Sequence, residues 1–208
     1  MKIRSKEELI DSLTNDLGWR KKELTTLFNN VQTANPKNLP TALRCAVVLL
    51  YAHWEGFIKN SAEYYLSYIK FQGLNLNQVN SNILALSLKQ KLTEFRETNK
   101  ATLHVKFVEY FQNNLTDKVV FSDTDTIKTQ SNLSSSILKE IFATIGIDIA
   151  NYELKSNLID KQLLNKRNNI AHGTQPPIDK EEYKTLHSEI VAMLDNIYTD
   201  ISNSVVLD

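Results

Sequence analysis

The sequence has few of the residues that interrupt regular structure. Its 208 residues include only five glycines and four prolines, and the long stretches between them repeat their apolar residues with a helical period. Apolar residues make up 42% of the chain, which excludes wholesale disorder. These observations favour an all-α protein that is long enough for one domain with a substantial core, or for two small ones.

Net charge, cysteine and long apolar runs are scarce as well. The 24 basic and 24 acidic residues balance, so any nucleic-acid binding must come from a local patch. The single Cys45 cannot form an internal disulfide, which fits a reducing cytoplasm, and we expect it to pack as a small hydrophobe. The longest apolar run, Cys45–Ala52, has eight residues, whereas a membrane span needs about 20. With no apolar signal segment at its start, the chain is expected to be a soluble cytoplasmic protein without membrane contact.

The motifs of common enzymes are also missing from the sequence. It contains no glycine-rich phosphate loop, no CxxC or HExxH metal-binding spacing, and no G-x-S-x-G nucleophile elbow. The four histidines and the one cysteine are too scattered to form a metal cage. We therefore expect no metal and no cofactor.

Two long helices are predicted in the first third of the chain. Ser5 and Glu8 form a capping-box pattern that opens a helix carrying apolar residues as far as Val31. After a break around Asn35 to Pro40, a second helix runs from about residue 41 to 71. Because it has the broadest apolar stripe in the chain, this helix is expected to be the central, largely buried helix of a bundle.

The remainder predicts shorter helices and one irregular region. Residues 74–131 form an insertion with helices near 82–97 and 102–114, and Val119–Phe121 has the composition of a short strand. Further helices are expected from about 132 to 145, from 157 to 171, and after Asp179, which pairs with Glu182 in another capping-box pattern. The predicted fold is a single helical domain over residues 1–208, with four to five core helices and the insertion.

The stretch Lys166-Arg-Asn-Asn-Ile-Ala-His-Gly173 is the most informative part of the sequence. On a regular helix, Arg167 projects into the apolar face that is formed by Ile159, Leu163, Leu164, Ile170 and Ala171. Asn168 and His172 lie one turn apart at the edge of that face. A guanidinium in an apolar face needs a partner, because burying it unpaired is prohibitive. We expect that partner to be Glu55, which lies beside the main stripe of the second helix.

A purely structural interpretation of this stretch is available. Arg167 can tether two helices through a salt bridge, and His172 can cap the C-terminus of a helix, where a cation is favoured. Two features favour a functional interpretation instead. Asn168, Asn169 and Gly173 stand where a packing helix would have apolar residues, and the arginine points into the interface.

The stretch from Arg167 to His172 resembles the R-x4-H motif of the HEPN superfamily, helical domains many of which are metal-independent endoribonucleases. The second helix, with Tyr51-Ala-His-Trp-Glu-Gly-Phe-Ile58, resembles a bacterial HEPN-like nuclease subfamily found in defence and toxin-type settings. The two signatures occur in the expected order, and the resemblance covers about residues 40–75 and 130–205. It implies a HEPN-like helical bundle.

The resemblance also implies a homodimer in which two motifs face each other and build one shared site. In such a site the RNA 2′-hydroxyl attacks the adjacent 3′ phosphate, leaving a cyclic phosphate and a free 5′-hydroxyl. His172 would move that proton, since histidine titrates near neutral pH, and Arg167 would stabilise the charge on the transition state. Asn168 would orient His172 or bind the phosphate, with Glu55 and Asn169 in support. Trp54, Phe57 and His53 are assigned to packing.

The RNA substrate would be tRNA or mRNA, and its binding needs further contacts to phosphates. The candidates for these contacts are Lys161, Lys166 and Lys180. In a protein of zero net charge, these lysines can equally form a solvated helix face. The resemblance implies a role in phage defence or as a toxin restrained by an antitoxin. Some HEPN toxins carry a modifiable tyrosine two residues after the histidine; here Thr174 takes that place. Two alternatives stay open: a non-catalytic HEPN module that binds RNA, nucleotide or a partner protein, and a helical scaffold with a structural Arg167–Glu55 pair.

Overall fold

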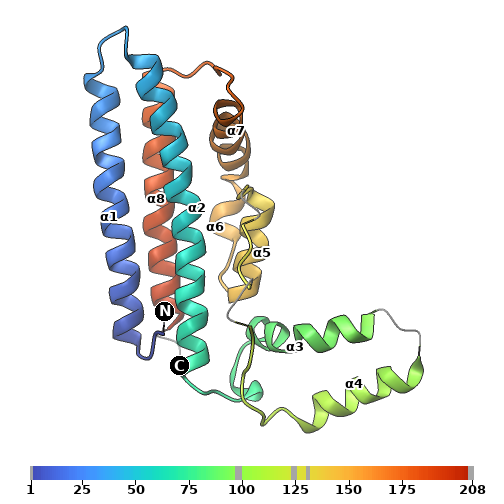
Figure 1. The fold of residues 1–208 in the computed structure, drawn as a ribbon. Coiled ribbons are helices and arrows are strands. Elements are labelled where there is room, and N and C mark those ends of the chain that lie inside the picture. Colours follow the sequence, from blue (N-terminus) through green and yellow to red (C-terminus); the bar gives the residue numbers. More distant parts are fainter. Residues whose placement is uncertain (1, 97–99, 123–125, 130–131, 206–208) are drawn as a thin grey trace.

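We analysed a computed structural model that describes residues 2–96, 100–122, 126–129 and 132–205. Its longest elements are three helices that lie side by side (Figure 1). They are α1 (Lys6–Thr33), α2 (Leu39–Phe71) and α8 (Lys180–Ser204), and each packs against the other two. The chain is all-α, as predicted, and the two expected long N-terminal helices are present.

The helix starts explain where α1 and α8 begin. The Ser5 side chain accepts a hydrogen bond from the Glu8 backbone N–H, and Asp179 accepts one from Glu182. The Glu8 carboxylate accepts a bond from the N–H of Arg4, one residue before the cap. Both predicted N-terminal caps are therefore formed.

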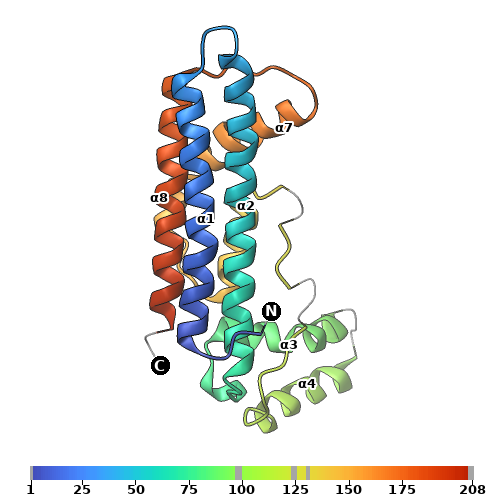
Figure 2. The same ribbon diagram turned by 60° about the vertical axis from the view of Figure 1, so that its left-hand side comes forward.

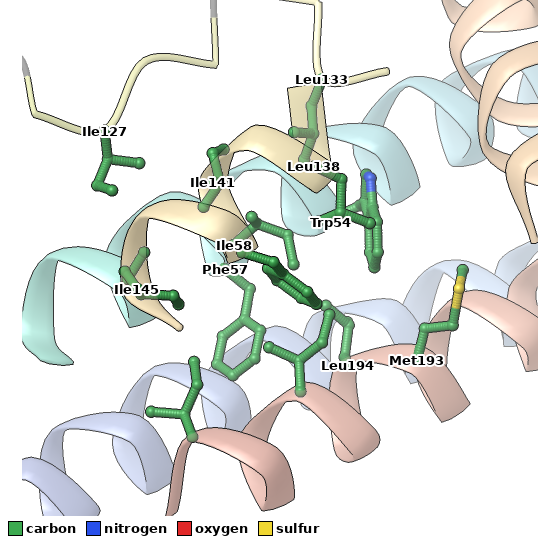
Figure 3. Close-up of a cluster of buried hydrophobic side chains, with 14 of the residues drawn as sticks. Trp54, Phe57, Ile58, Ile127, Leu133, Leu138, Ile141, Ile145, Met193 and Leu194 are labelled. Carbon is green, nitrogen blue, oxygen red and sulfur yellow. The ribbon is translucent and has the colours of Figure 1, made fainter. Parts of the chain in front are cut away.

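Helix α2 is the centre of the structure, because it contacts α1 and α8 on one side and α5 (Ser135–Ile145) and α7 (Asn165–Ala171) on the other. Figure 3 shows Trp54, Phe57 and Ile58 of α2 among side chains of α5 and α8. Trp54 and Phe57 are completely buried, as expected for core residues, and His53 is 4% exposed. Cys45 differs from its prediction: it lies on the exposed face of α2, not in the core.

The insertion is largely helical. It contains a short 3-10 turn, η1 (Leu76–Gln78), and a pair of helices, α3 (Ser81–Arg96) and α4 (Ala101–Asn113), close to the predicted ranges. Helices α3 and α4 project near the C-terminal end of α2, whereas α7 lies beside its N-terminal half (Figures 1 and 2). The helix pair and the candidate motif are thus at opposite ends of α2.

The predicted strand at Val119–Phe121 is wrong. Within the described residues this region forms one isolated antiparallel bridge, between Asn75 and Lys118, and the Val119 N–H donates to the Leu74 carbonyl at 2.9 Å. A strand needs a partner along its whole length, and the facing chain turns away at once into η1.

Of the described helices, none has the length and apolarity to cross a membrane.

Candidate functional site

The motif is reached through a wide helical turn that the sequence did not reveal. After the short helix α6 (Ala150–Glu153), residues Leu158–Leu164 form a π-helix, η2, which continues directly into α7. The Asn165 N–H bonds the carbonyl of Asp160, five residues back. The predicted helix over 157–171 is therefore present, but its first half has π geometry and not the regular α geometry that was assumed for the side-chain directions. A π-turn rotates all later side chains relative to the earlier ones, and such turns are frequent at functional sites.

The end of α7 places His172 in solvent. Its backbone N–H donates to the Asn168 carbonyl at 2.9 Å, and the helix stops because Gly173 adopts a left-handed conformation with φ of +80°. Ala171 is exposed too, contrary to its predicted place on the apolar face. His172 is thus an exposed imidazole at the C-terminus of α7, which continues from η2 with its buried Ile159 and Leu163.

Arg167, by contrast, turns towards α2 and keeps only 20% of its side chain exposed. Three groups surround its guanidinium. The Tyr51 ring lies 4.0 Å from the Cζ atom, the Glu55 Oε2 atom lies 3.7 Å from Nη2, and Nη1 donates to Asn168 Oδ1 at 2.6 Å. The predicted pair with Glu55 is present, and the guanidinium points into the interface as expected.

Asn168 and Glu55 both act on the arginine. The side-chain oxygen of Asn168 is bound to Arg167, whereas its backbone carbonyl makes the ordinary main-chain helix bond to the His172 N–H. The second carboxylate oxygen of Glu55, Oε1, is buried and accepts no hydrogen bond from the residues that the structure describes. The Glu55 carboxylate also contributes to the raised pKa of Tyr51, so it acts on both the arginine and the tyrosine.

Tyr51 is the contact that the sequence did not single out. It lies on the buried face of α2 and is 2% exposed, and its ring also contacts the arginine. Its hydroxyl accepts a hydrogen bond from the backbone N–H of Leu133 at 2.6 Å. Burial raises the pKa of Tyr51 to about 12, so the phenol stays neutral at physiological pH.

The three candidate RNA-binding lysines are not equivalent. Lys161 is exposed. Lys166 forms an ion pair with Glu182, and Lys180 donates to the Gln32 carbonyl at 3.0 Å. Lys161, Lys166 and Asn169 line one pocket of about 610 Å³ between α7 and the start of α8. Lys161, Lys166 and Asn169 thus lie together beside the motif. Lys180 instead joins α8 to α1.

A second buried charge, Arg20, escaped the sequence reasoning. Its Nε donates to Asp16 Oδ1 at 3.2 Å and its Nη1 to the His53 carbonyl at 3.3 Å. The Asp16 carboxylate also accepts bonds from Trp19 and Asn60. Like Arg167, Arg20 falls inside the apolar stripe of a predicted helix. Its position in that stripe is therefore the signal by which the sequence could have identified it.

No group of three or more His, Cys, Asp or Glu side chains suited to a metal ion occurs in the described ranges of the chain. The candidate site therefore consists of a stacked and paired arginine, an asparagine bound to that arginine, and a histidine in solvent. A cation held against an aromatic ring, and an exposed imidazole at the end of the same helix, are groups that can bind an anion.

The fold is an all-α bundle that presents this candidate site beside its central helix. The family model RiboL-PSP-HEPN matches residues 15–203, and the chain belongs to this HEPN family. Comparison with curated proteins gave no match, and comparison with solved structures gave none either.

Proposed function

We propose that this protein is a metal-independent endoribonuclease of the HEPN type, which acts as a homodimer with a composite Arg167/His172 site. The observation that carries the proposal is the unequal placement of the two side chains. Arg167 is fixed against α2 by Tyr51, Glu55 and Asn168, while His172 stands in solvent at the end of the same helix. A second copy facing this surface would supply the complementary pair for one phosphate.

The chemistry assigns a role to each group. His172 takes the proton of the 2′-hydroxyl, whose oxygen forms a new bond to the adjacent phosphorus as the bond from phosphorus to the 5′-oxygen breaks. The leaving oxygen gains a proton and becomes a 5′-hydroxyl, and a cyclic phosphate remains. Arg167 stabilises the extra negative charge on the phosphorus centre, and the Asn168 side chain orients Arg167.

RNA binding next to the site would use the pocket beside α7. Lys161 is the exposed cation there, and Asn169 offers an amide, whereas Lys166 is engaged by Glu182. A role in phage defence or as a toxin restrained by a partner protein belongs to the same proposal.

The proposal is tested by incubating total tRNA and a generic single-stranded RNA with the protein in EDTA. We expect wild-type protein to cut and to leave cyclic phosphate and 5′-hydroxyl ends. His172→Ala and Arg167→Ala should each lower the rate by at least about 100-fold while remaining folded dimers. His104→Ala, which removes an exposed histidine from α4, is the matched control and should cut at the wild-type rate.

Two further arms separate the alternatives. Arg167→Lys keeps a charge opposite Glu55 but loses the planar fork, so it should fold normally and still cut poorly. Mixing the His172→Ala and Arg167→Ala proteins should restore part of the activity if one site draws on both subunits. A stable wild-type dimer that binds RNA without cutting it would instead support the non-catalytic module, and loss of folding in Arg167→Ala alone would support a structural ion pair.

A further inference from the structure

We propose that Tyr51 is a positioning residue, whose ring holds the Arg167 guanidinium in the plane needed to bind a phosphate. The inference rests on the proposed function for its consequence in catalysis. Its structural part, the fixing of Arg167 by a ring face, stands on geometry alone.

The contact is of a kind that leaves an arginine able to bind. The Cζ atom of Arg167 lies over the Tyr51 ring, 4.0 Å from its centre, so the ring covers one side of the guanidinium. Stacking uses none of the five N–H donors, which project from the edge of the group and match the oxygens of a phosphate. A ring therefore fixes the orientation of the arginine without consuming the bonds that a substrate needs.

The ring is itself fixed at its far end. Its hydroxyl accepts a hydrogen bond from the backbone N–H of Leu133, a residue that is completely buried. Two residues later, the N–H and the hydroxyl of Ser135 donate to the Asp160 carboxylate at 2.7 and 2.6 Å. Asp160 belongs to η2, which continues into α7, the helix that carries Arg167.

The segment from Leu133 to Ser135 therefore ties the two sides of the contact together. It holds the Tyr51 hydroxyl on α2 and binds the wide turn that leads to Arg167. The contact of Tyr51 with Arg167 is therefore supported from both sides, in addition to the ion pair of Arg167 with Glu55. Glu55 adds an ion pair at 3.7 Å, a longer contact than a hydrogen bond, so the ring contributes to holding the guanidinium in place.

A buried tyrosine can also be nothing more than core, and two substitutions distinguish the roles. Tyr51→Phe keeps the ring and loses the bond to Leu133. Tyr51→Leu keeps apolar volume and loses the ring face. If Tyr51 only packs, cleavage should follow the folded fraction; if it positions Arg167, cleavage should follow the presence of a ring.

The test measures kcat and KM with one RNA oligonucleotide, along with the folded fraction at the assay temperature. We expect Tyr51→Phe to keep kcat within about threefold of wild type. Tyr51→Leu should lose about tenfold to a hundredfold in kcat with a smaller change in KM, because a misoriented arginine fails mainly in the transition state. Equal kcat in folded Tyr51→Leu and folded Tyr51→Phe would overturn the proposal.

A second measurement does not depend on cleavage or on the folding of the leucine variant. In a ¹⁵N-labelled protein, the side-chain N–H signal of Arg167, assigned by its absence from Arg167→Lys, should be displaced by the ring current of Tyr51. The displacement should persist in Tyr51→Phe. A signal at the position of a solvent-exposed arginine in wild-type protein would overturn the proposal. If that signal is displaced but wild type does not cut RNA, the proposed function fails and the positioning role stands.

Discussion

At the scale of single residues, Gly56 shows how a missing side chain makes room for a buried charge. A Cβ atom built on Gly56 would lie 2.6 Å from Nη1 of Arg20. Arg20 cannot simply move aside, because it is buried and bonded to Asp16 and to the His53 carbonyl. The glycine within the Trp-Glu-Gly-Phe sequence is therefore explained by packing between α1 and α2.

We predict that Gly56→Ala destabilises the protein by about 1–2 kcal/mol, measured by urea unfolding. An alanine in a helix normally gains up to about 1 kcal/mol over glycine, but here the displaced Arg20 loses part of its buried network, which costs more. Gly18→Ala is the matched control, since nothing lies within 4 Å of its Cβ position in α1. It should be stabilising by about 0.5–1 kcal/mol. A gain of similar size in both variants would contradict the explanation.

At the scale of elements, the start of α5 depends on η2. The Asp160 carboxylate accepts two hydrogen bonds from Ser135, the first residue of α5, and these bonds connect that helix to the turn before the motif. Asp160 was not among the residues that the sequence marked, because its partner is 25 residues away in the chain. The position of α7 thus depends on a contact made by the element before it.

We predict that Asp160→Ala lowers the free energy of unfolding by about 1–3 kcal/mol. The variant loses two hydrogen bonds to a charged group, and the backbone N–H of Ser135 loses its acceptor. The measurement is again urea unfolding. Asp148→Ala removes an exposed carboxylate that accepts a bond from Ala150 at the start of α6. This control should cost clearly less. Equal losses of unfolding free energy in the two variants would show that the hydrogen bonds between α5 and η2 stabilise the protein no more than an exposed helix cap does.

At the scale of the whole molecule, His187 couples stability to pH. It lies in α8, where its ring packs on Phe28 and Tyr183 and its Nε2 atom is 3.3 Å from the Leu24 carbonyl. Burial lowers the pKa of His187, and the hydrogen bond with Leu24 opposes this only in part. The folded protein therefore resists protonating this histidine, while the unfolded chain takes up a proton near the ordinary pKa of about 6.5.

The sign of the effect follows from that difference. Above about pH 7 the histidine is neutral in both states and its contribution is complete; as the pH falls below 6.5, the unfolded state gains protons and stability is lost. The loss for one group is at most about 1.4 kcal/mol per pH unit. Unfolding free energies at pH 7.5, 6.5 and 5.5 should fall more steeply in wild type than in His187→Gln. Parallel profiles would contradict the prediction.

Much of the fold followed from the sequence because its signals are local. Apolar period, capping patterns and breakers predicted α1, α2, α5 and α8, the helix pair of the insertion and the central place of α2. The predicted strand at Val119–Phe121 was wrong because a strand forms only where a second extended segment lies alongside it. The predicted burial of Cys45 was wrong because an apolar run shows that a helix has a buried face, but not which residues of the run face outwards.

The sequence by itself determined that Arg167 enters an interface and that a carboxylate should meet it, because helical period and the cost of a buried charge are both local. Only the tertiary structure decided the rest. It put the Tyr51 ring under the guanidinium, made the turn before α7 a π-helix, and engaged Lys166 and Lys180 in contacts of their own. These depend on which elements pack together across long stretches of chain, and no residue pattern within one helix specifies that.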